Sequence, residues 1–187
     1  MQPAGTGPVR MIHVAVMRVL FSTERFDVVE LERGHEAAML AVYSDAEAMR
    51  HVGDGEPATA AEIDRWMEVT ADNVARRGYG MSAALARGER SGEVVGFVGL
   101  VHPGGQEEPE LKYALRREWW GQGVATELAA GAVAWGHGRF GMERIIATVA
   151  PAHAASLRVL ARCGFERLED IEEVDGSSTA LLEWRAG

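Results

Sequence analysis

The sequence predicts an α+β domain with a mixed, mostly antiparallel central sheet of about seven strands, flanked by about four helices. Short apolar runs predict strands, apolar residues at helical spacing predict helices, and clusters of turn-forming residues separate the two. One succession of strand, helix and strand, at 110–150, predicts a parallel pair joined by a right-handed crossover. The remaining strands follow one another closely enough to pair antiparallel.

Each predicted element has its own signal in the sequence. Thr59 lies three residues before Glu62, which matches a capping box at a helix start. Asp175-Gly176 is a strong hairpin turn signal between the last two strands. Strands are predicted at 24–33, 80–87, 93–102, 110–115, 143–150, 165–174 and 178–186, and helices at 34–52, 59–78, 123–141 and 154–164.

The chain is expected to form one domain. It has 187 residues, of which 47% are hydrophobic and 25% charged, as is typical of a single globular domain. Residues 23–187 are assigned to that domain, and residues 1–22 to an N-terminal extension that is partly disordered or adds a strand. The apolar run at 11–21 is too short to cross a membrane and no cleavage site for a signal peptide follows it. A cytoplasmic protein is therefore expected.

Charge and cysteine content exclude several partners. The formal net charge is −9, which argues against nucleic acid and anionic membranes as ligands. Cys163 is the single cysteine, which excludes an internal disulfide and a cysteine-based zinc site.

The stretch "REWWGQGVATE", at 117–127, places two glycines between a strand and a helix. Gly121 and Gly123 permit a sharp turn or a close approach to a ligand. The start of a helix presents unpaired N–H groups that attract anions. The stretch is not a P-loop, because the only lysine, Lys112, lies in the preceding strand, and it lacks the third glycine of a dinucleotide fingerprint. Two interpretations stay open, an anion-binding loop and a tight turn.

Motifs in three places resemble the GCN5-related N-acetyltransferase (GNAT) superfamily, in particular its branch similar to the ribosomal-protein alanine N-acetyltransferases (RimJ/RimL-like). The run "ELKYAL…WWGQGVATE" resembles the branch's E-I-G-Y-W-L…Y-W-G-x-G-x-A-T-E, and "SLRVLARCGFE" resembles S-x-R-V-L-x-K-x-G-F-E. The run "STERFDVVEL" is similar to T-x-R-L-x-L-R-x-L. The resemblance covers 23–184 and implies a GNAT-like fold whose parallel strands splay apart. It also implies direct acetyl transfer from acetyl-CoA, in a ternary complex, to a primary amine that is a protein N-terminus or a small amine. A homodimer is compatible with it.

The resemblance also implies which residues form the site. Amides from Gly121 to Thr126 would bind the diphosphate of acetyl-CoA, and an N–H between Tyr113 and Leu115 would polarise the thioester carbonyl. No metal is required. The implied cofactor-binding residues are Tyr113, Leu115, Arg116, Gly121, Gln122, Gly123, Val124, Ala125, Thr126, His153, Ser156 and Arg162.

The implied catalytic residues are Glu110, His153 and Ser156, each with an alternative. Glu110 is the first candidate for the base and otherwise an exposed strand carboxylate; His102 is the second candidate or a surface residue. Ser156 would assist the departing thiolate, or bond to the helix backbone. His153 would donate to pantetheine, act as a base, or be a tolerated loop residue. Arg162, with Arg158, would face the 3′-phosphate or be solvated.

The sequence departs from the family pattern at three positions. Glu118 replaces the usual Gln or Arg, with Arg116 and Arg117 expected to offset its charge. His153 replaces an Asn, and Leu160 replaces a tyrosine that many relatives carry, as is common in this branch. Glu118 and His153 leave a second function open, a non-catalytic acyl-CoA-binding sensor module. A third hypothesis, a purely structural domain, treats the glycines as turn residues.

Overall fold

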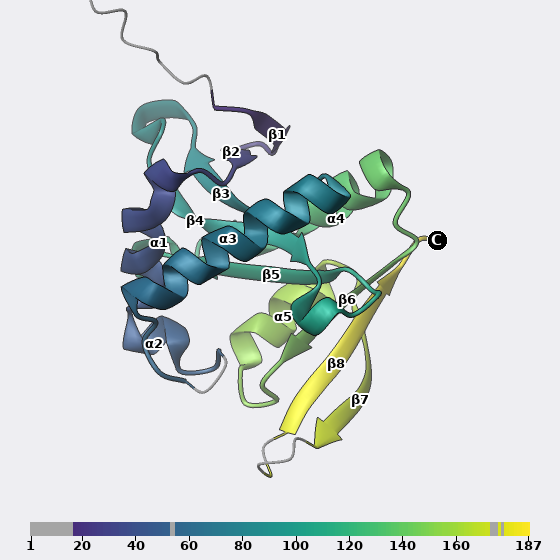
Figure 1. The fold of residues 1–187 in the computed structure, drawn as a ribbon. Helices are drawn as coiled ribbons and strands as arrows, with labels where there is room; N and C mark the ends of the chain where they lie inside the picture. Colours follow the sequence, from purple (N-terminus) through teal and green to yellow (C-terminus); the bar gives the residue numbers. More distant parts are fainter. Residues whose placement is uncertain (1–16, 53–54, 173–175, 177) are drawn as a thin grey trace, which may run out of the picture.

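The computed structural model describes residues 17–52, 55–172, 176 and 178–187 (Figure 1). Eight strands form one sheet in the order β1-β2-β3-β4-β5-β6-β8-β7. The strands are β1 (Val19–Ser22), β2 (Phe26–Glu30), β3 (Met81–Ala86), β4 (Val94–Val101), β5 (Glu110–Leu115), β6 (Arg144–Val149), β7 (Glu166–Glu172) and β8 (Ser178–Arg185). Neighbouring strands are antiparallel except β5 and β6, which are parallel. The predicted fold class and its parallel pair are confirmed. The sheet has one strand more than predicted, because β1 pairs with β2.

The described residues form five α-helices, one more than predicted. They are α1 (Glu36–Tyr43), α2 (Ala46–Met49), α3 (Ala60–Arg77), α4 (Val124–Phe140) and α5 (Ala154–Arg162). The prediction of one continuous helix at 34–52 is wrong, because Asp45 interrupts it. Its backbone is extended and its carboxylate accepts the N–H groups of Glu47 and Ala48 at 2.9 and 3.3 Å, which starts α2 afresh.

The predicted ends of α3 are confirmed. The Thr59 hydroxyl accepts the N–H of Glu62 at 3.3 Å, and the Glu62 carboxylate accepts the N–H of Thr59 at 2.8 Å. Gly78 ends α3 with φ 83°. Helix α4 runs through Gly136 and Gly138 and stops at Gly141, the last residue of the helix predicted at 123–141.

Helices cover both faces of the sheet (Figure 1). Helices α1 and α3 pack on one face over a buried cluster that includes Met39, Ile63 and Phe97. Helices α4 and α5 pack on the other face over a second cluster that includes Leu128 and Leu160. The central strands are therefore buried on both sides, which explains their nearly continuous apolar sequence.

Strands β5 and β6 part soon after they meet. They are in register at Glu110 and Ile146, where the N–H of Ile146 donates to the carbonyl of Pro109 at 2.9 Å. Beyond that point the two strands no longer pair, as the predicted splay requires. Strand β6 stays in the sheet by pairing with β8 along its whole length. The backbone between the two strands is left without its usual ladder partner.

The last two strands form an antiparallel pair, β7 with β8, in which Glu172 lies opposite Ser178. Asp175 of the predicted hairpin turn, like residues 1–16 of the predicted extension, lies outside the described residues. In the part of the chain that the structure describes, no helix has the length and apolar character needed to cross a membrane.

Candidate functional site

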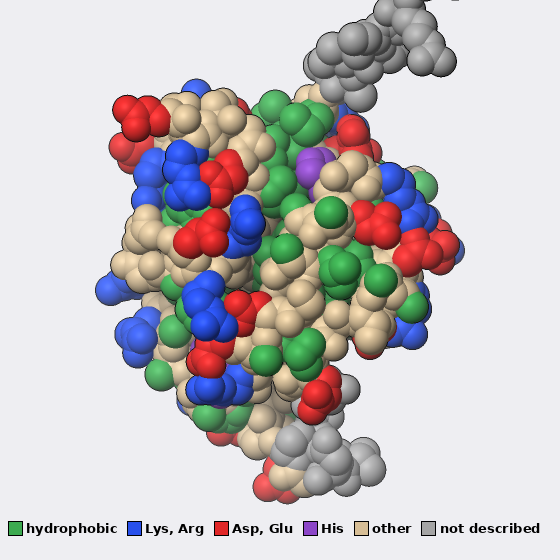
Figure 2. All heavy atoms as spheres, turned by 90° about the vertical axis from the view of Figure 1, so that its left-hand side faces the viewer, with side chains coloured by type: hydrophobic (Ala, Val, Ile, Leu, Met, Phe, Trp, Pro, Cys, Tyr) green, Lys and Arg blue, Asp and Glu red, His purple; other side chains and the backbone are tan. Residues whose placement is uncertain are grey.

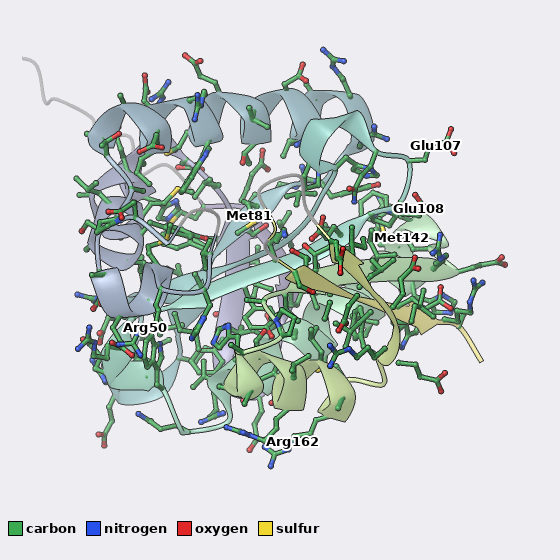
Figure 3. All side chains as sticks on the ribbon, turned by 90° about the horizontal axis from the view of Figure 1, so that it is seen from below. Arg50, Met81, Glu107, Glu108, Met142 and Arg162 are labelled. Atoms are coloured by element: carbon green, nitrogen blue, oxygen red, sulfur yellow. The ribbon has the colours of Figure 1, made fainter. Side chains whose placement is uncertain are left out.

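A cleft of about 1220 Å³ opens where β5 and β6 part. One side of it is formed by 111–114 of β5 and 147–150 at the end of β6. Helix α5 contributes Ser156 and Leu160, and His153 lies immediately before this helix. The opposite wall is mainly apolar and comes from α1, α3 and β3, with Met81 near the middle of the molecule in the view from below (Figure 3). Its apolar members are Met39, Tyr43, Trp66, Val69 and Met81.

The backbone of β5 points hydrogen-bond donors into this cleft. The N–H of Arg116 donates to the carbonyl of Val95 in β4 at 2.9 Å. Because an antiparallel ladder alternates its direction from one residue to the next, the N–H groups of Tyr113 and Leu115 face away from β4, toward the side where β6 has parted. These amides can therefore pair with a ligand between the strands, as the sequence analysis expected of the 113–115 segment.

The loop that follows β5 leaves the first turn of α4 open. Gly121 and Gly123 have φ of 71° and 75°, a backbone conformation that residues with a side chain rarely adopt. No side chain caps the start of α4, and all three residues from Gly121 to Gly123 are exposed. The first-turn N–H groups, at 124–126, have no intrahelical acceptor. The backbone here fits a diphosphate, which takes N–H donors and the positive end of a helix dipole.

The side chains of this loop serve mainly to shape it. The amide group of Gln122 donates to the carbonyl of Glu118 at 2.7 Å, so Gln122 closes the loop on itself and offers a ligand only its backbone. Val124 is buried, whereas Ala125 and Thr126 are half-buried. Trp119 is buried edge-on against Phe26, with ring centroids 5.9 Å apart, and so anchors the loop to the core.

The charge of Glu118 is compensated, but not by the pair of arginines that the sequence analysis expected. Its carboxylate lies 3.7 Å from Arg116 and 3.8 Å from Arg90. Arg117 instead forms an ion pair with Asp45, the residue that caps α2. Arg90 was missed because it lies in the turn between β3 and β4, far from the loop in sequence. On the side of the molecule where α1 and α2 lie, acidic and basic side chains are interspersed in the same way (Figure 2).

Glu110 is buried at the point where β5 and β6 part. Its carboxylate lies 2.5 Å from the ammonium group of Lys112 and accepts both the N–H of Thr148, at 3.2 Å, and the Thr148 hydroxyl. The amide of Gln106 donates to its other oxygen at 3.3 Å. The alternative of an exposed strand carboxylate is therefore wrong. The N–H of Thr148 in β6 thus donates to the Glu110 side chain and not to the backbone of β5, from which β6 has parted. Glu110 is absent from the described residues that line the cleft.

Of the two histidines considered as bases, His102 is already engaged. Its Nδ1 lies 2.9 Å from the carbonyl of Gln106 and its Nε2 lies 2.9 Å from the hydroxyl of Tyr79. A carbonyl only accepts, so Nδ1 carries a proton and donates it to this carbonyl. His102 is also buried, so the alternative of a surface residue is wrong.

His153 lies at the cleft, immediately before α5. It is half-buried and its ring stacks on that of His51, with centroids 4.7 Å apart. Burial, and to a lesser degree the neighbouring His51, lower the pKa of His153 below its usual 6.5. The imidazole is therefore neutral at pH 7 and able to accept a proton.

Ser156 and Tyr113 face each other on one side of the cleft. The hydroxyl of Tyr113 lies 2.7 Å from the Oγ of Ser156, and both residues line the cleft. Burial raises the pKa of Tyr113 to about 12, so the phenol stays protonated at neutral pH. The sequence predicted a role for the backbone of Tyr113 but not for its hydroxyl group. Leu160, at the position of the family's tyrosine, is 1% exposed and packs in the core.

Arg162 and Arg158 lie on the exposed surface of α5. Figure 3 shows Arg162 at the outer edge of the molecule, away from Met81 at its centre. Both positions suit a phosphate outside the cleft rather than one inside it. The described residues contain no group of three or more His, Cys, Asp or Glu side chains positioned to hold a metal ion.

Comparison with known proteins identifies the domain. Residues 25–166 match the family model of the acetyltransferase (GNAT) domain. The chain is 28% identical over 158 residues to an FsC-acetyl coenzyme A-N(2)-transacetylase of Aspergillus fumigatus, which is 79% of this chain and 65% of that protein. It is 30% identical over 99 residues to the YkkB protein of Bacillus subtilis, which is 52% of this chain and 58% of that protein. The chain thus spans less than two thirds of the length of the curated relatives it matches.

Solved structures share the fold. A GNAT-family acetyltransferase from Bacillus anthracis aligns with a TM-score of 0.73 at 19% identity, covering 88% of this chain and 96% of its own. RimL, a ribosomal L7/L12 alpha-N-protein acetyltransferase solved with coenzyme A, aligns with a TM-score of 0.72 at 14% identity, covering 90% and 98%. A Vibrio cholerae spermidine N-acetyltransferase, solved with CoA and spermine, aligns with a TM-score of 0.71 at 16% identity, covering 86% and 95%. With the family-model match across 25–166, the splayed β5–β6 pair and the open start of α4, the chain belongs to the GNAT acetyltransferase family.

Proposed function

We propose that this protein is an acetyl-CoA-dependent N-acetyltransferase that moves the acetyl group directly to a primary amine in a ternary complex. The observation that carries the proposal is the continuity of the site within a GNAT domain. Strand β5 directs free amides into the cleft and leads, through the 116–123 loop, to the open first turn of α4. One ligand with a thioester, an extended arm and a diphosphate can use all three features.

Acetyl-CoA would be held mainly by the backbone. The amides of 121–126 would bind its diphosphate, and those of Tyr113 and Leu115 would pair with its extended arm between the strands. One amide of this segment would donate to the thioester carbonyl, where negative charge develops as the amine attacks. Arg162 would meet the 3′-phosphate from the surface of α5.

Proton transfers accompany both halves of the reaction. An acceptor amine with a pKa of ~10.4 arrives as an ammonium ion and must lose a proton before it attacks the thioester carbon. The C–N bond then forms and the C–S bond breaks. The departing thiolate takes up a proton from a side chain, and that side chain regains a proton from the nitrogen as the neutral amide forms. We assign the first transfer to neutral His153, because it lines the cleft and its side chain forms no hydrogen bond with the described residues. We assign the second to the Tyr113 hydroxyl, supported by Ser156.

Glu110 competes with His153 for the role of base. Its carboxylate is 2% exposed and already contacts Lys112, Thr148 and Gln106. Glu110 is also absent from the described lining of the cleft, where an acceptor amine would bind. We therefore propose that Glu110 acts by keeping β5 and β6 apart at the right place.

The side chains that line the cleft limit the class of acceptor amine that can bind. Its wall is apolar and aromatic around Tyr43 and Trp66, which pack edge to face with centroids 5.2 Å apart. The charged side chains among its described lining are those of Arg50 and Lys112. The acidic Glu107 lies at the opposite end of the molecule from Arg50 (Figure 3). We propose an acceptor with one amine on a largely apolar body, either a protein N-terminus or a small amine. A polyamine such as spermidine, after which the Vibrio cholerae enzyme is named, fits this lining less well.

The test is release of CoA from acetyl-CoA in the presence of an amine panel. The panel contains phenylalkylamines, peptides with apolar N-terminal residues, and spermidine. The proposal predicts CoA release with the apolar amines and mass gain of one acetyl group on the acceptor. Tight acetyl-CoA binding without transfer to any amine would instead support an acyl-CoA-binding sensor. The cytoplasmic location and the homodimer remain predictions from the sequence.

A further inference from the structure

The turn between β1 and β2 brings Arg25 to the start of α4. The carboxylate of Glu127, in the first turn of α4, accepts the hydroxyl of Thr23 at 2.7 Å and the N–H of Arg25 at 2.8 Å. It also accepts the side-chain Nε–H of Arg25 at 2.6 Å. Three hydrogen bonds thus fix the turn, the carboxylate and the guanidinium relative to one another across about a hundred residues of sequence.

The other end of the Arg25 side chain lies at the glycine loop. Its Nη2 is the nearest atom to the place where a Cβ would stand on Gly123, at 3.9 Å. The Arg25 side chain donates to Glu127 through Nε. Its two Nη groups donate no hydrogen bond to the described residues. Arg25 has a side-chain exposure of 42%, so a ligand can reach it.

The two arginines nearest to the glycine loop in sequence already form ion pairs within the protein. Arg116 pairs with Glu93 and Glu118, and Arg117 pairs with Asp45. The strand before the loop supplies Lys112, whose ammonium group is held by Glu110. Among the residues described around the loop, Arg25 therefore combines an oriented guanidinium with unengaged Nη groups.

We propose that Arg25 donates its Nη groups to the diphosphate bound at the start of α4, and that Glu127 is the positioning residue that aims it. A guanidinium matches phosphate oxygens with paired donors, and a fixed guanidinium loses less freedom on binding than a mobile one. The same ion pair removes a second problem, since an unpaired Glu127 would place a negative charge beside the phosphates. The inference rests on the proposed function, because it takes the diphosphate of CoA as the ligand.

The test is calorimetric titration of CoA and dephospho-CoA into the wild type and Arg25→Gln. Both ligands carry the diphosphate, but dephospho-CoA lacks the 3′-phosphate. Losing a hydrogen bond to a charged group weakens binding about tenfold or more, so Arg25→Gln should raise both dissociation constants by about tenfold. The matched control is Arg18→Gln. Arg18 is also exposed but pairs with Glu30, so its replacement should leave both dissociation constants unchanged.

Further variants separate this contact from general damage. Arg25→Lys keeps the charge but cannot contact Glu127 and a phosphate with the same fork, so it should also weaken both ligands. Glu127→Gln should weaken both, although it removes a negative charge from the site. Unchanged affinity for both ligands in Arg25→Gln would overturn the inference; if that variant does not fold, Arg25→Lys is measured in its place. Weaker binding of CoA alone would also overturn it, because that result would place Arg25 at the 3′-phosphate. Failure of the wild type to bind CoA would overturn the proposed function itself.

Discussion

The hydroxyl group of Tyr113 lies 2.7 Å from the Oγ of Ser156, which joins the middle of β5 to the first turn of α5 at one side of the cleft. Burial keeps the phenol protonated, with a pKa of about 12. The family pattern places a tyrosine on α5, where this chain has Leu160, and the structure supplies a phenol from the neighbouring strand instead. This pairing motivates the assignment of Tyr113 as the acid for the thiolate.

Replacing Tyr113 by Phe removes that acid and keeps the ring. General acid catalysis contributes about 10²- to 10⁴-fold, and Ser156 and water can replace part of it, so kcat should fall by about 10- to 100-fold with little change in the KM for acetyl-CoA. Steady-state kinetics measure both constants. Tyr43→Phe is the matched control, because Tyr43 lines the same cleft and its loss of a hydroxyl should leave kcat within about twofold. An unaltered kcat in Tyr113→Phe would remove the phenol from the mechanism.

The pH dependence of the reaction should report His153. Burial lowers its pKa below 6.5, so the neutral base is present above that range and is lost as pH falls through the lowered pKa. In the wild type, kcat/KM should therefore fall on the acid side with an apparent pKa below 6.5. His153→Ala should lose this limb and about 10² or more in kcat/KM at neutral pH. His153→Asn, which restores the family's residue, should lose the limb too. An acid limb that survives in both variants would point to another base.

The same shift in His153 has a consequence for folding. Because its pKa is lower in the folded than in the unfolded chain, the neutral form favours folding, and this contribution is lost as pH falls from 6.5 through the folded-state pKa. The melting temperature of His153→Ala should therefore decline less than that of the wild type over this interval. Thermal denaturation at matched ionic strength measures the difference, and parallel declines would contradict the shift.

Glu110→Gln separates a structural carboxylate from a base. The substitution leaves Lys112 without its carboxylate partner, but Lys112 has a side-chain exposure of 40% and can turn to water, so the expected loss of stability is about 1–3 kcal/mol. The pH profile of kcat/KM should keep the acid limb that we assign to His153, and kcat should fall less than in His153→Ala. A loss of activity of about 10³ or more at unchanged melting temperature would make Glu110 the base instead.

Gly123→Ala tests the open start of α4. Gly123 has φ 75°, so a side chain there strains the backbone that presents the amides, and its Cβ would stand near Arg25. The affinity for CoA should fall by about tenfold or more, measured by titration. Gly138→Ala is the matched control, because Gly138 lies inside α4 with no atom within 4 Å of an added Cβ. It should bind CoA normally and gain up to about 1 kcal/mol in stability.

Local signals in the sequence predicted most of the fold. The capping box at Thr59 and Glu62, and the strand–loop–helix succession around Gly121, are recorded in neighbouring residues and were found where expected. The break at Asp45 was missed because the apolar pattern continues on both sides of it, and only the carboxylate capping α2 reveals the interruption.

The site was predicted less completely, because its contacts join distant segments. The glycine loop follows from its own residues, whereas the hydroxyl pair of Tyr113 and Ser156 depends on how β5 and α5 meet. The compensation of Glu118 by Arg90 depends in the same way on the position of the β3–β4 turn. Besides Lys112, the partners of Glu110 come from β6 and from the chain before β5, and no spacing in the sequence indicates that this carboxylate is buried.

A crystal structure of the protein with CoA tests the central claim most directly, namely that main-chain amides at the start of α4 bind the diphosphate of the coenzyme. The account predicts diphosphate oxygens within about 2.7–3.2 Å of amide nitrogens between Gly121 and Thr126, with the pantetheine arm lying between β5 and β6. A coenzyme bound elsewhere on the chain, with these amides in contact only with water, would contradict it.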